Sequence, residues 1–529
     1  MQKVQKQTFL EGALIMAVAN IVVKVIGAFF KIPLKNLIGS DGMGMFYGAY
    51  NIYSALVVMS TAGLPVAISR MVAESNAKGR GREVERILSV SFGLLLGLGL
   101  FSAVLMAAAA KPLMEYQRNP DAFYSVLVLS PAVFFVALMS VYRGYCQGLA
   151  NMVPTAVSQL IEAFCKLVFG YGFAILALRL GYDVKIAAAG AIMGVTLGTV
   201  FGAIYMSIRH RKVRETVDFS DMDTEARPKK ELFWTLIKIA VPITIGAAVM
   251  SLTNLIDNFV VMRRLQDIGY AAPRTVSMYG AYSSMSVALM TLPQTLIVGM
   301  TVSLIPAIAA AYGRKDYMQA RRNTESAVRL TGILTFPCAV GLYVLAWPLL
   351  NLLFTADVDF AAPLLKELAF AFVCVSLVSV TNALLQAAGK ERLPVISMTI
   401  GGVVKLVTNY ILIGIPSIAI NGAPIGTICC YATIAIINIV FVYKKTELGP
   451  RQWWQLWKPL AAALVMGVFA HFAYPALAGM LGARLGVCVV LLGCIVLYFL
   501  MLWVIGGFNR EDILMLPKGK KLARLLRLK

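Results

Sequence analysis

The sequence is poor in charge and in the side chains that carry acid–base and metal chemistry. Only 14% of its 529 residues are charged, and only His210 and His471 are histidines. Soluble domains have about 25% charged residues, and disordered chains have few apolar ones, so both classes are excluded. No P-loop, His-Glu-x-x-His or Gly-x-Ser-x-Gly motif occurs. The sequence therefore predicts a protein that is not an enzyme and that uses no metal or cofactor.

Cysteine pairs with metal-binding spacing are also lacking. No Cys-x-x-Cys occurs, and the eight cysteines all lie in or beside apolar segments: Cys146, Cys165, Cys338, Cys374, Cys429, Cys430, Cys488 and Cys494. We interpret them as small apolar side chains that take part in helix packing.

Long apolar runs are what the sequence has in abundance, because 59% of the chain is apolar. A membrane helix needs about 20 such residues. Apolar runs between polar breaks predict an all-α polytopic membrane protein with about fourteen spans. The predicted spans are 10–34, 43–68, 87–110, 122–143, 152–178, 184–208, 233–262, 276–309, 328–354, 363–388, 394–415, 422–443, 459–478 and 485–506. No secretory signal is evident, since the first run is too long for one.

The basic residues orient these spans. Of the 48 Lys and Arg, 33 fall on the side of the N-terminus and 11 on the opposite side. Because positive charge concentrates in cytoplasmic loops, we predict that both termini are cytoplasmic in a multi-pass protein of the plasma membrane. Most of the net charge of +22 then faces anionic inner-leaflet lipid, and no nucleic acid partner is needed to explain it.

The chain repeats itself weakly, which predicts two lobes. Tyr-Gly-Ala-Tyr at 47–50 recurs at 279–282, and Lys-Leu-Val at 166–168 recurs at 405–407. The offsets pair spans 1–6 with spans 7–12 in the same orientation, a parallel repeat typical of transporters. The predicted divisions are an N-lobe (1–208), a cytoplasmic linker (209–232), a C-lobe (233–443), two extra spans (444–506) and a basic cytoplasmic tail (507–529).

Ionisable residues inside spans point to function, because each costs roughly 2.5–3.5 kcal/mol to insert. They are Lys24, Glu162, Lys166, Asp257 and Lys405. Glu162 and Lys166 are four residues apart, so one reading is a neutralised pair that only helps span 5 to insert. Lys24 and Lys405 have no acid within a turn and need a partner on another helix, a wet cavity or an anionic ligand. Asp257 forms either a salt bridge to Lys24 or Lys405, or a gating or coupling-ion site.

The interior is therefore net positive, which favours an anionic substrate. Arg143, at the predicted cytoplasmic edge of span 4, could receive an anionic head group, although a topogenic arginine is the alternative.

Several segments resemble a known family. They are 24–34, 38–44, 50–53, 63–69, 143–148, 154–162 and 242–257. The chain resembles the stage V sporulation protein B-like polysaccharide transporters of the multidrug/oligosaccharidyl-lipid/polysaccharide (MOP) exporter superfamily. Its fourteen spans also resemble MurJ-type lipid II flippases.

The resemblance implies a flippase that moves undecaprenyl-pyrophosphate-linked saccharides to the outer leaflet by alternating access, for peptidoglycan, spore-cortex or other wall polymers. It implies a V-shaped pair of lobes and a lipid-tail groove at spans 13–14. Lys24 and Lys31 match the basic first-span positions of MurJ-type relatives. The arginines that those relatives carry in spans 2 and 8 are missing here.

Together the residues and the resemblance predict a site. Lys24, Lys31, Arg143, Lys166 and Lys405 are expected to bind an anionic head group. The expected gating or coupling residues are Asp41, Glu162 and Asp257. The expected partners are a lipid-linked oligosaccharide, membrane lipids and cell-wall synthesis enzymes, and the membrane potential, Na⁺ or H⁺ can supply the energy. The alternatives are a multidrug/cation antiporter of the same superfamily and, from another class, a membrane-embedded transferase.

Overall fold

The structure is a computed structural model that describes residues 9–214, 226–314, 316–445 and 456–507. Over these ranges the chain forms helices and no strand. Long apolar runs favour this outcome, because a helix satisfies its own backbone hydrogen bonds in lipid. The helices form two compact units that divide within the π-helical segment Tyr282–Val287, at Ser284.

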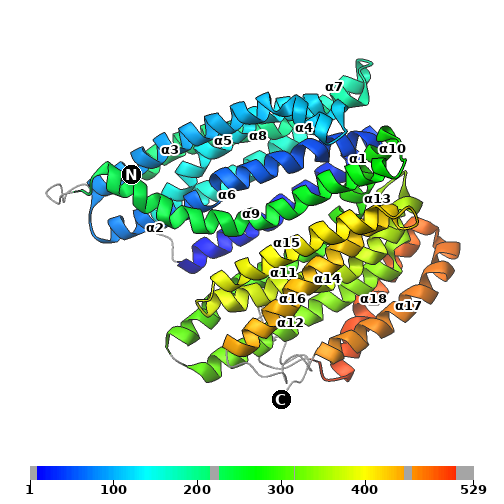
Figure 1. Cartoon of the computed structure of the whole chain (residues 1–529). Helices are drawn as coiled ribbons and strands as arrows, with labels where there is room; N and C mark the ends of the chain where they lie inside the picture. The colour runs from blue at the N-terminus through cyan, green and yellow to red at the C-terminus, as the bar shows by residue number, and fades with distance from the viewer. Residues whose placement is uncertain (1–8, 215–225, 315, 446–455, 508–529) are drawn as a thin grey trace. The chain divides into compact units, whose positions relative to one another are not determined.

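In the part of the first unit that the structure describes, there are ten α-helices, labelled in Figure 1. They are α1 (Phe9–Thr61), α2 (Gly63–Ala77), α3 (Gly81–Ala108), α4 (Ala110–Tyr116), α5 (Phe123–Gly148), α6 (Val153–Cys165), α7 (Tyr171–Arg179), α8 (Val184–Arg214), α9 (Lys229–Asp267) and α10 (Ala272–Ala281). A 3₁₀ turn, η1 (Pro120–Ala122), precedes α5, and a π-helical segment, η2 (Lys166–Gly170), joins α6 to α7.

The second unit contains the remaining helices (Figure 1). They are α11 (Ala288–Gly313), α12 (Tyr317–Val344), α13 (Ala346–Leu353), α14 (Val358–Ala387), α15 (Arg392–Ile413), α16 (Gly422–Lys445), α17 (Trp457–Leu481) and α18 (Ala483–Val504). Helix α14 packs against α11, α12 and α16, while α17 packs against α12 and α18.

Twelve stretches of the described chain are long and apolar enough to cross a membrane. The first, Val18–Ala77, is 60 residues long and covers two of the predicted spans, and Gly39 interrupts α1 within it with φ 70° and ψ −175°, a conformation that favours glycine. The stretch from α10 through the π-helical segment to α11 lies over another predicted span. The prediction of an all-α polytopic membrane protein with about fourteen spans is confirmed.

A ridge of glycines on α8 brings the helices of the first unit into close contact. Gly190, Gly194, Gly198 and Gly202 recur every four residues. A Cβ atom at Gly194 would collide with the backbone nitrogen of Gly170, and one at Gly198 would lie 2.8 Å from the carbonyl oxygen of Glu162. Small residues at this spacing let membrane helices approach closely. The ridge therefore seats α6 and η2 directly against α8.

Helices α9 and α10 belong to the first unit by packing. Both contact α1, and the Asn51 side-chain amide donates a hydrogen bond to the Tyr279 hydroxyl at 2.8 Å. Gly44 lies so close to Val276 that a Cβ atom would collide with its carbonyl. The repeat assigns these two helices to the C-lobe (233–443), so the lobe boundaries stay a prediction.

Candidate functional site

The first unit contains a partly open cavity of about 330 Å³ between α1, α5, α6, η2 and α8. Three of the predicted site residues line it: Arg143, Glu162 and Lys166. The remaining lining residues are Asn20, Val23, Gly27, Phe30, Tyr50, Tyr53, Gln159, Ala163, Val195 and Thr199. The cavity thus combines two cations and one carboxylate with amides and aromatic rings.

Arg143 is held in the cavity wall by α6. Its Nε and Nη2 atoms donate hydrogen bonds of 2.9 and 2.8 Å to the hydroxyl of Ser158. That hydroxyl in turn donates to the carbonyl of Thr155 at 2.8 Å, so it is oriented to accept from the guanidinium. Arg143 also forms an ion pair with Glu162. The side chain is only 15% exposed and lies in the cavity wall, while the head-group role and the topogenic role of Arg143 both stay predictions.

The reading of Glu162 and Lys166 as a neutralised pair is wrong. Both residues line the same cavity, as their spacing predicts, but the Glu162 carboxylate pairs with Arg143 of α5. The physical reason is that Ser158 already orients the guanidinium toward α6, and a planar guanidinium is a better carboxylate partner than an ammonium. The i,i+4 rule describes an isolated helix, and here a neighbouring helix competes.

Lys166 lies among aromatic rings instead. Its Nζ atom is 5.0 Å from the ring centroid of Phe30, 5.7 Å from that of Phe46 and 4.7 Å from that of Tyr50. A cation within about 6 Å of a ring face is attracted by the ring quadrupole. Lys166 is also the first residue of η2, and π-helical turns are frequent at functional sites. The rings hold the ammonium in the cavity without neutralising its charge.

The aromatic rings are the part of the site that the sequence analysis missed. Phe46 and Tyr50 stack at a centroid distance of 5.6 Å and an angle of 17°, and Tyr50 contacts Tyr53 at 5.8 Å. The repeated Tyr-Gly-Ala-Tyr motif at 47–50 was a usable signal, because aromatic residues three positions apart lie on the same face of a helix.

Lys24 and Lys31 of α1 lie outside the lining of this cavity. Lys24 is exposed on its helix. The Nζ atom of Lys31 is 5.5 Å from the ring centroid of Tyr47. Lys35 falls between the predicted spans 10–34 and 43–68, yet its side chain is only 1% exposed, so it is a buried lysine that the span boundaries did not reveal.

The other predicted residues lie elsewhere. Asp41 lines a second pocket of the first unit, about 460 Å³ in volume, together with Arg118, Asp121, Asp183 and Lys185. Asp257 of α9 is buried in the first unit, and Lys405 of α15 is buried in the second. A bridge between Asp257 and Lys405 therefore stays a prediction, as do the gating roles.

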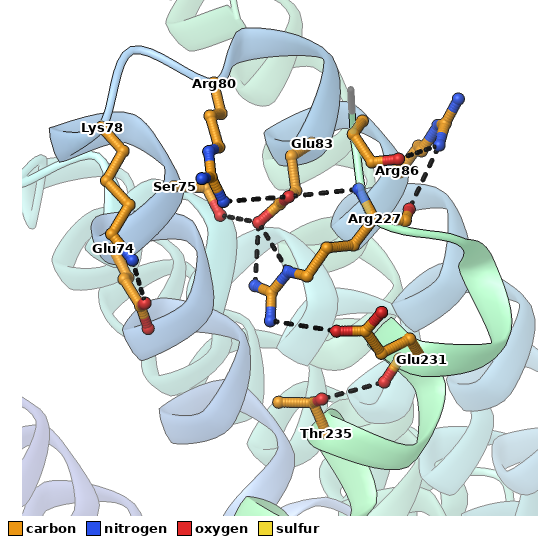
Figure 2. Close-up of polar contacts among 10 residues, drawn as sticks. Glu74, Ser75, Lys78, Arg80, Glu83, Arg86, Arg227, Glu231 and Thr235 are labelled. Carbon is orange, nitrogen blue, oxygen red and sulfur yellow. Dashed lines mark hydrogen bonds and ion pairs between the residues drawn. The ribbon is translucent and has the colours of Figure 1, made fainter. Parts of the chain in front are cut away.

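A buried carboxylate fastens the chain before α9 to the start of α3 (Figure 2). Glu83 is 1% exposed and accepts hydrogen bonds from Arg227 Nε at 3.1 Å, Arg227 Nη2 at 2.8 Å and Ser75 Oγ at 2.7 Å. The bonds to Glu83 raise the pKa of Arg227. Arg86 donates to the carbonyls of Ala226 and Arg227 at 2.6 and 3.1 Å. The end of the predicted linker is thus bound to the first unit.

The second unit contains two apolar cavities along α17. One, of about 340 Å³, lies between α12, α17 and α18 and includes Pro337, Leu491 and Tyr498. The other, of about 560 Å³, lies between α12, α14 and α17 and includes Phe336, Tyr343 and His471. Both are lined mainly by apolar side chains.

Comparisons with known proteins agree with this architecture. The model of the family described as polysaccharide biosynthesis protein matches residues 9–312, and the MatE family model matches residues 242–411. Stage V sporulation protein B of Bacillus subtilis (strain 168) is 27% identical over 454 residues, 84% of this chain and 85% of the relative. Lipid II flippase MurJ of the same strain is 24% identical over 457 residues, 83% of each chain.

A solved structure shares the fold. It is the inward-facing conformation of a multidrug resistance MATE family transporter of the MOP superfamily. It is similar with a TM-score of 0.67 at 15% identity, over 82% of this chain and 98% of that one. The family model covers more than half of the sequence, and the relatives align over most of it. The chain therefore belongs to the polysaccharide biosynthesis protein family, and it is a multi-pass transporter of the MOP superfamily.

Proposed function

We propose that this transporter moves an undecaprenyl-diphosphate-linked saccharide from the inner to the outer leaflet of the plasma membrane by alternating access. The observation that carries the proposal is the cavity of the first unit, where Arg143 and Lys166 face Glu162. Two cations against one carboxylate favour an anion, and the surrounding apolar helices strengthen that preference. A guanidinium binds phosphate oxygens in pairs, and a lysine adds a point charge.

The other cavity residues suit a sugar next to the diphosphate. Tyr50 and Tyr53 offer ring faces, while Asn20 and Gln159 offer amides that can bond hydroxyl groups. The volume of about 330 Å³ lies near the lower end of the range for small-ligand sites. We therefore expect the cavity to hold the diphosphate and the first sugar, with the rest of the head group outside it.

The apolar cavities of the second unit suit the polyprenyl tail. Their walls come from α12, α14, α17 and α18, which include the two helices beyond the repeat. Burial of hydrocarbon against such walls contributes about 25 cal/mol per Å². This supports the expectation that spans 13–14 guide the lipid.

The membrane potential favours this direction of transport. With both termini in the cytoplasm, as the basic loops predict, an outward step moves two negative charges. Each charge gains about 2.3 kcal/mol per 100 mV, so the step gains roughly 4–5 kcal/mol. Enzymes that polymerise or attach the exported saccharide would be the partners on the outer face.

The proposal can be tested with purified protein in liposomes. The probe is undecaprenyl diphospho-N-acetylglucosamine, and a membrane-impermeant galactosyltransferase labels only the sugars on the outer leaflet. We expect the protein to make inner-leaflet probe accessible, and Arg143→Ala and Lys166→Ala to lose this activity. Lys238→Ala is the matched control, because Lys238 is an exposed lysine of α9 outside the cavity.

A multidrug/cation antiporter of the same superfamily is the competing function. It would export a cationic dye from the same liposomes and leave the lipid-linked sugar inaccessible. Rescue of a strain conditionally depleted of its lipid II flippase would identify lipid II as a substrate. Failure of rescue alongside activity in liposomes would point to another wall or spore polymer.

A further inference from the structure

We infer that Glu162 competes with the anionic substrate for Arg143, so that substrate binding brings one proton to Glu162. The inference rests on the proposed function and deepens it, because it concerns how the same cavity changes its charge. It starts from the ion pair between Arg143 and Glu162, in which both partners line the cavity.

Arg143 is placed to exchange partners without moving. Its Nε and Nη2 atoms are held by Ser158, which is itself fixed by the Thr155 carbonyl. The guanidinium therefore keeps its position when the carboxylate leaves. A diphosphate entering the cavity meets a fixed donor fork that carboxylate and phosphate bind in the same manner.

Glu162 is the partner that can move. Its side chain is 26% exposed, compared with 15% for Arg143. The helix that packs behind it presents glycines, since a Cβ atom at Gly202 would lie 3.3 Å from the Glu162 Cγ atom and one at Gly198 would lie 2.8 Å from its carbonyl oxygen. The carboxylate can therefore move into the cavity by adopting a different rotamer.

The charged groups around Glu162 decide what happens after the exchange. Helix α5 contributes Arg143, and η2 contributes Lys166, whose ammonium lies over the rings of Phe30, Phe46 and Tyr50. Helix α1 contributes the hydroxyls of Tyr50 and Tyr53 to the cavity, while its Lys24 and Lys31 lie outside the lining. Helix α6 adds the Cys165 thiol and the neutral Gln159, and the lining residues of α8 are uncharged.

These charges leave a displaced carboxylate unstable. The empty cavity holds two cations and one anion. A bound diphosphate adds two negative charges, which the two cations balance only if Glu162 is neutral. An ionised carboxylate that has lost its cationic partner and lies beside a like charge takes up a proton. When the substrate leaves, Glu162 pairs again with Arg143 and releases that proton. An outward step that carries the proton with the diphosphate moves one net negative charge instead of two, so its gain from the membrane potential is half of that for the diphosphate alone.

The linkage can be measured directly as protons taken up on binding. The probe is farnesyl diphospho-N-acetylglucosamine, a disubstituted diphosphate whose two charges do not titrate near neutral pH. Calorimetric titration of the full-length protein in buffers of different ionisation enthalpy gives the number of protons. We expect about one proton per bound probe, and binding that weakens as the pH rises.

Glu162→Gln should bind the probe without proton uptake and without pH dependence. Its affinity at neutral pH should be roughly tenfold to a hundredfold higher, because a competing charge-assisted hydrogen bond is gone. Glu115→Gln is the matched control, since Glu115 is an exposed carboxylate of α4 outside the cavity. It should take up protons as the unmodified protein does.

Two results would overturn the inference and leave the proposed function standing: binding by the unmodified protein without proton uptake, or undiminished uptake in Glu162→Gln. The first result decides the matter even where Glu162→Gln does not fold. Failure of both proteins to bind the probe would remove the proposed function and the inference together.

Discussion

The Glu83 carboxylate and the Arg227 guanidinium join through two hydrogen bonds across 144 residues of sequence. The bonds tie the chain that precedes α9 to the first turn of α3, and Ser75 completes the coordination of the same carboxylate oxygen. Since α9 also packs against α1, α2 and α3, the chain enters this helix already fixed to the first unit.

Arg227→Ala should destabilise the first unit by about 2–3 kcal/mol, because it removes the closer of the two charged partners of a buried carboxylate and leaves only Arg80, at 3.7 Å. Glu83→Gln should cost less, since a neutral amide can keep part of the bonding. Thermal unfolding followed by proteolysis near residue 227 measures both effects. Glu74→Gln is the control: Glu74 forms an exposed pair with Lys78, and a loss above about 1 kcal/mol there would contradict the role of burial.

The aromatic rings around Lys166 should matter for substrate affinity. Tyr50→Leu removes the nearest ring, at 4.7 Å from the ammonium, and should weaken probe binding about threefold to thirtyfold. Tyr50→Phe keeps the ring and should bind nearly as well. Equal losses in the two variants would show that the hydroxyl, not the ring face, is the contributing group.

The importance of Lys24 and of Lys166 for transport can be compared directly. We expect Lys166→Ala to abolish movement of the lipid-linked sugar, because its ammonium lines the cavity. Lys24→Ala should retain more activity, since Lys24 is exposed outside the lining. The galactosyltransferase assay in liposomes measures both. Complete loss in Lys24→Ala with normal expression would place Lys24 on the substrate path, as the family resemblance implies.

The glycine ridge of α8 should be intolerant of even one methyl group. Gly194→Ala would push against the backbone of Gly170, which cannot yield as a flexible side chain does, and should destabilise the unit by about 1–3 kcal/mol. Gly172→Ala is the matched control, because no atom lies within 4 Å of the place that its new methyl group would take. Equal unfolding temperatures for the two variants would contradict the close contact.

The sequence by itself determined the class, the approximate number of spans and the family. In lipid, an apolar run of membrane length forms a helix because a helix satisfies its own backbone hydrogen bonds. The helices from α3 to α18 therefore follow closely from composition. The cost of inserting charge also marked Glu162 and Lys166 as cavity residues before their surroundings were known.

Tertiary packing alone decided which groups contact the charged side chains. Glu162 had a lysine one turn away, yet it pairs with Arg143, which is nineteen positions distant on another helix. Lys166 gained rings from α1, and Lys35 became buried although it sits at a predicted loop. Helical spacing constrains only neighbours on the same helix, whereas the contacts of Glu162 and Arg143 arise because glycines on α8 and the Ser158 hydroxyl bring separate helices together.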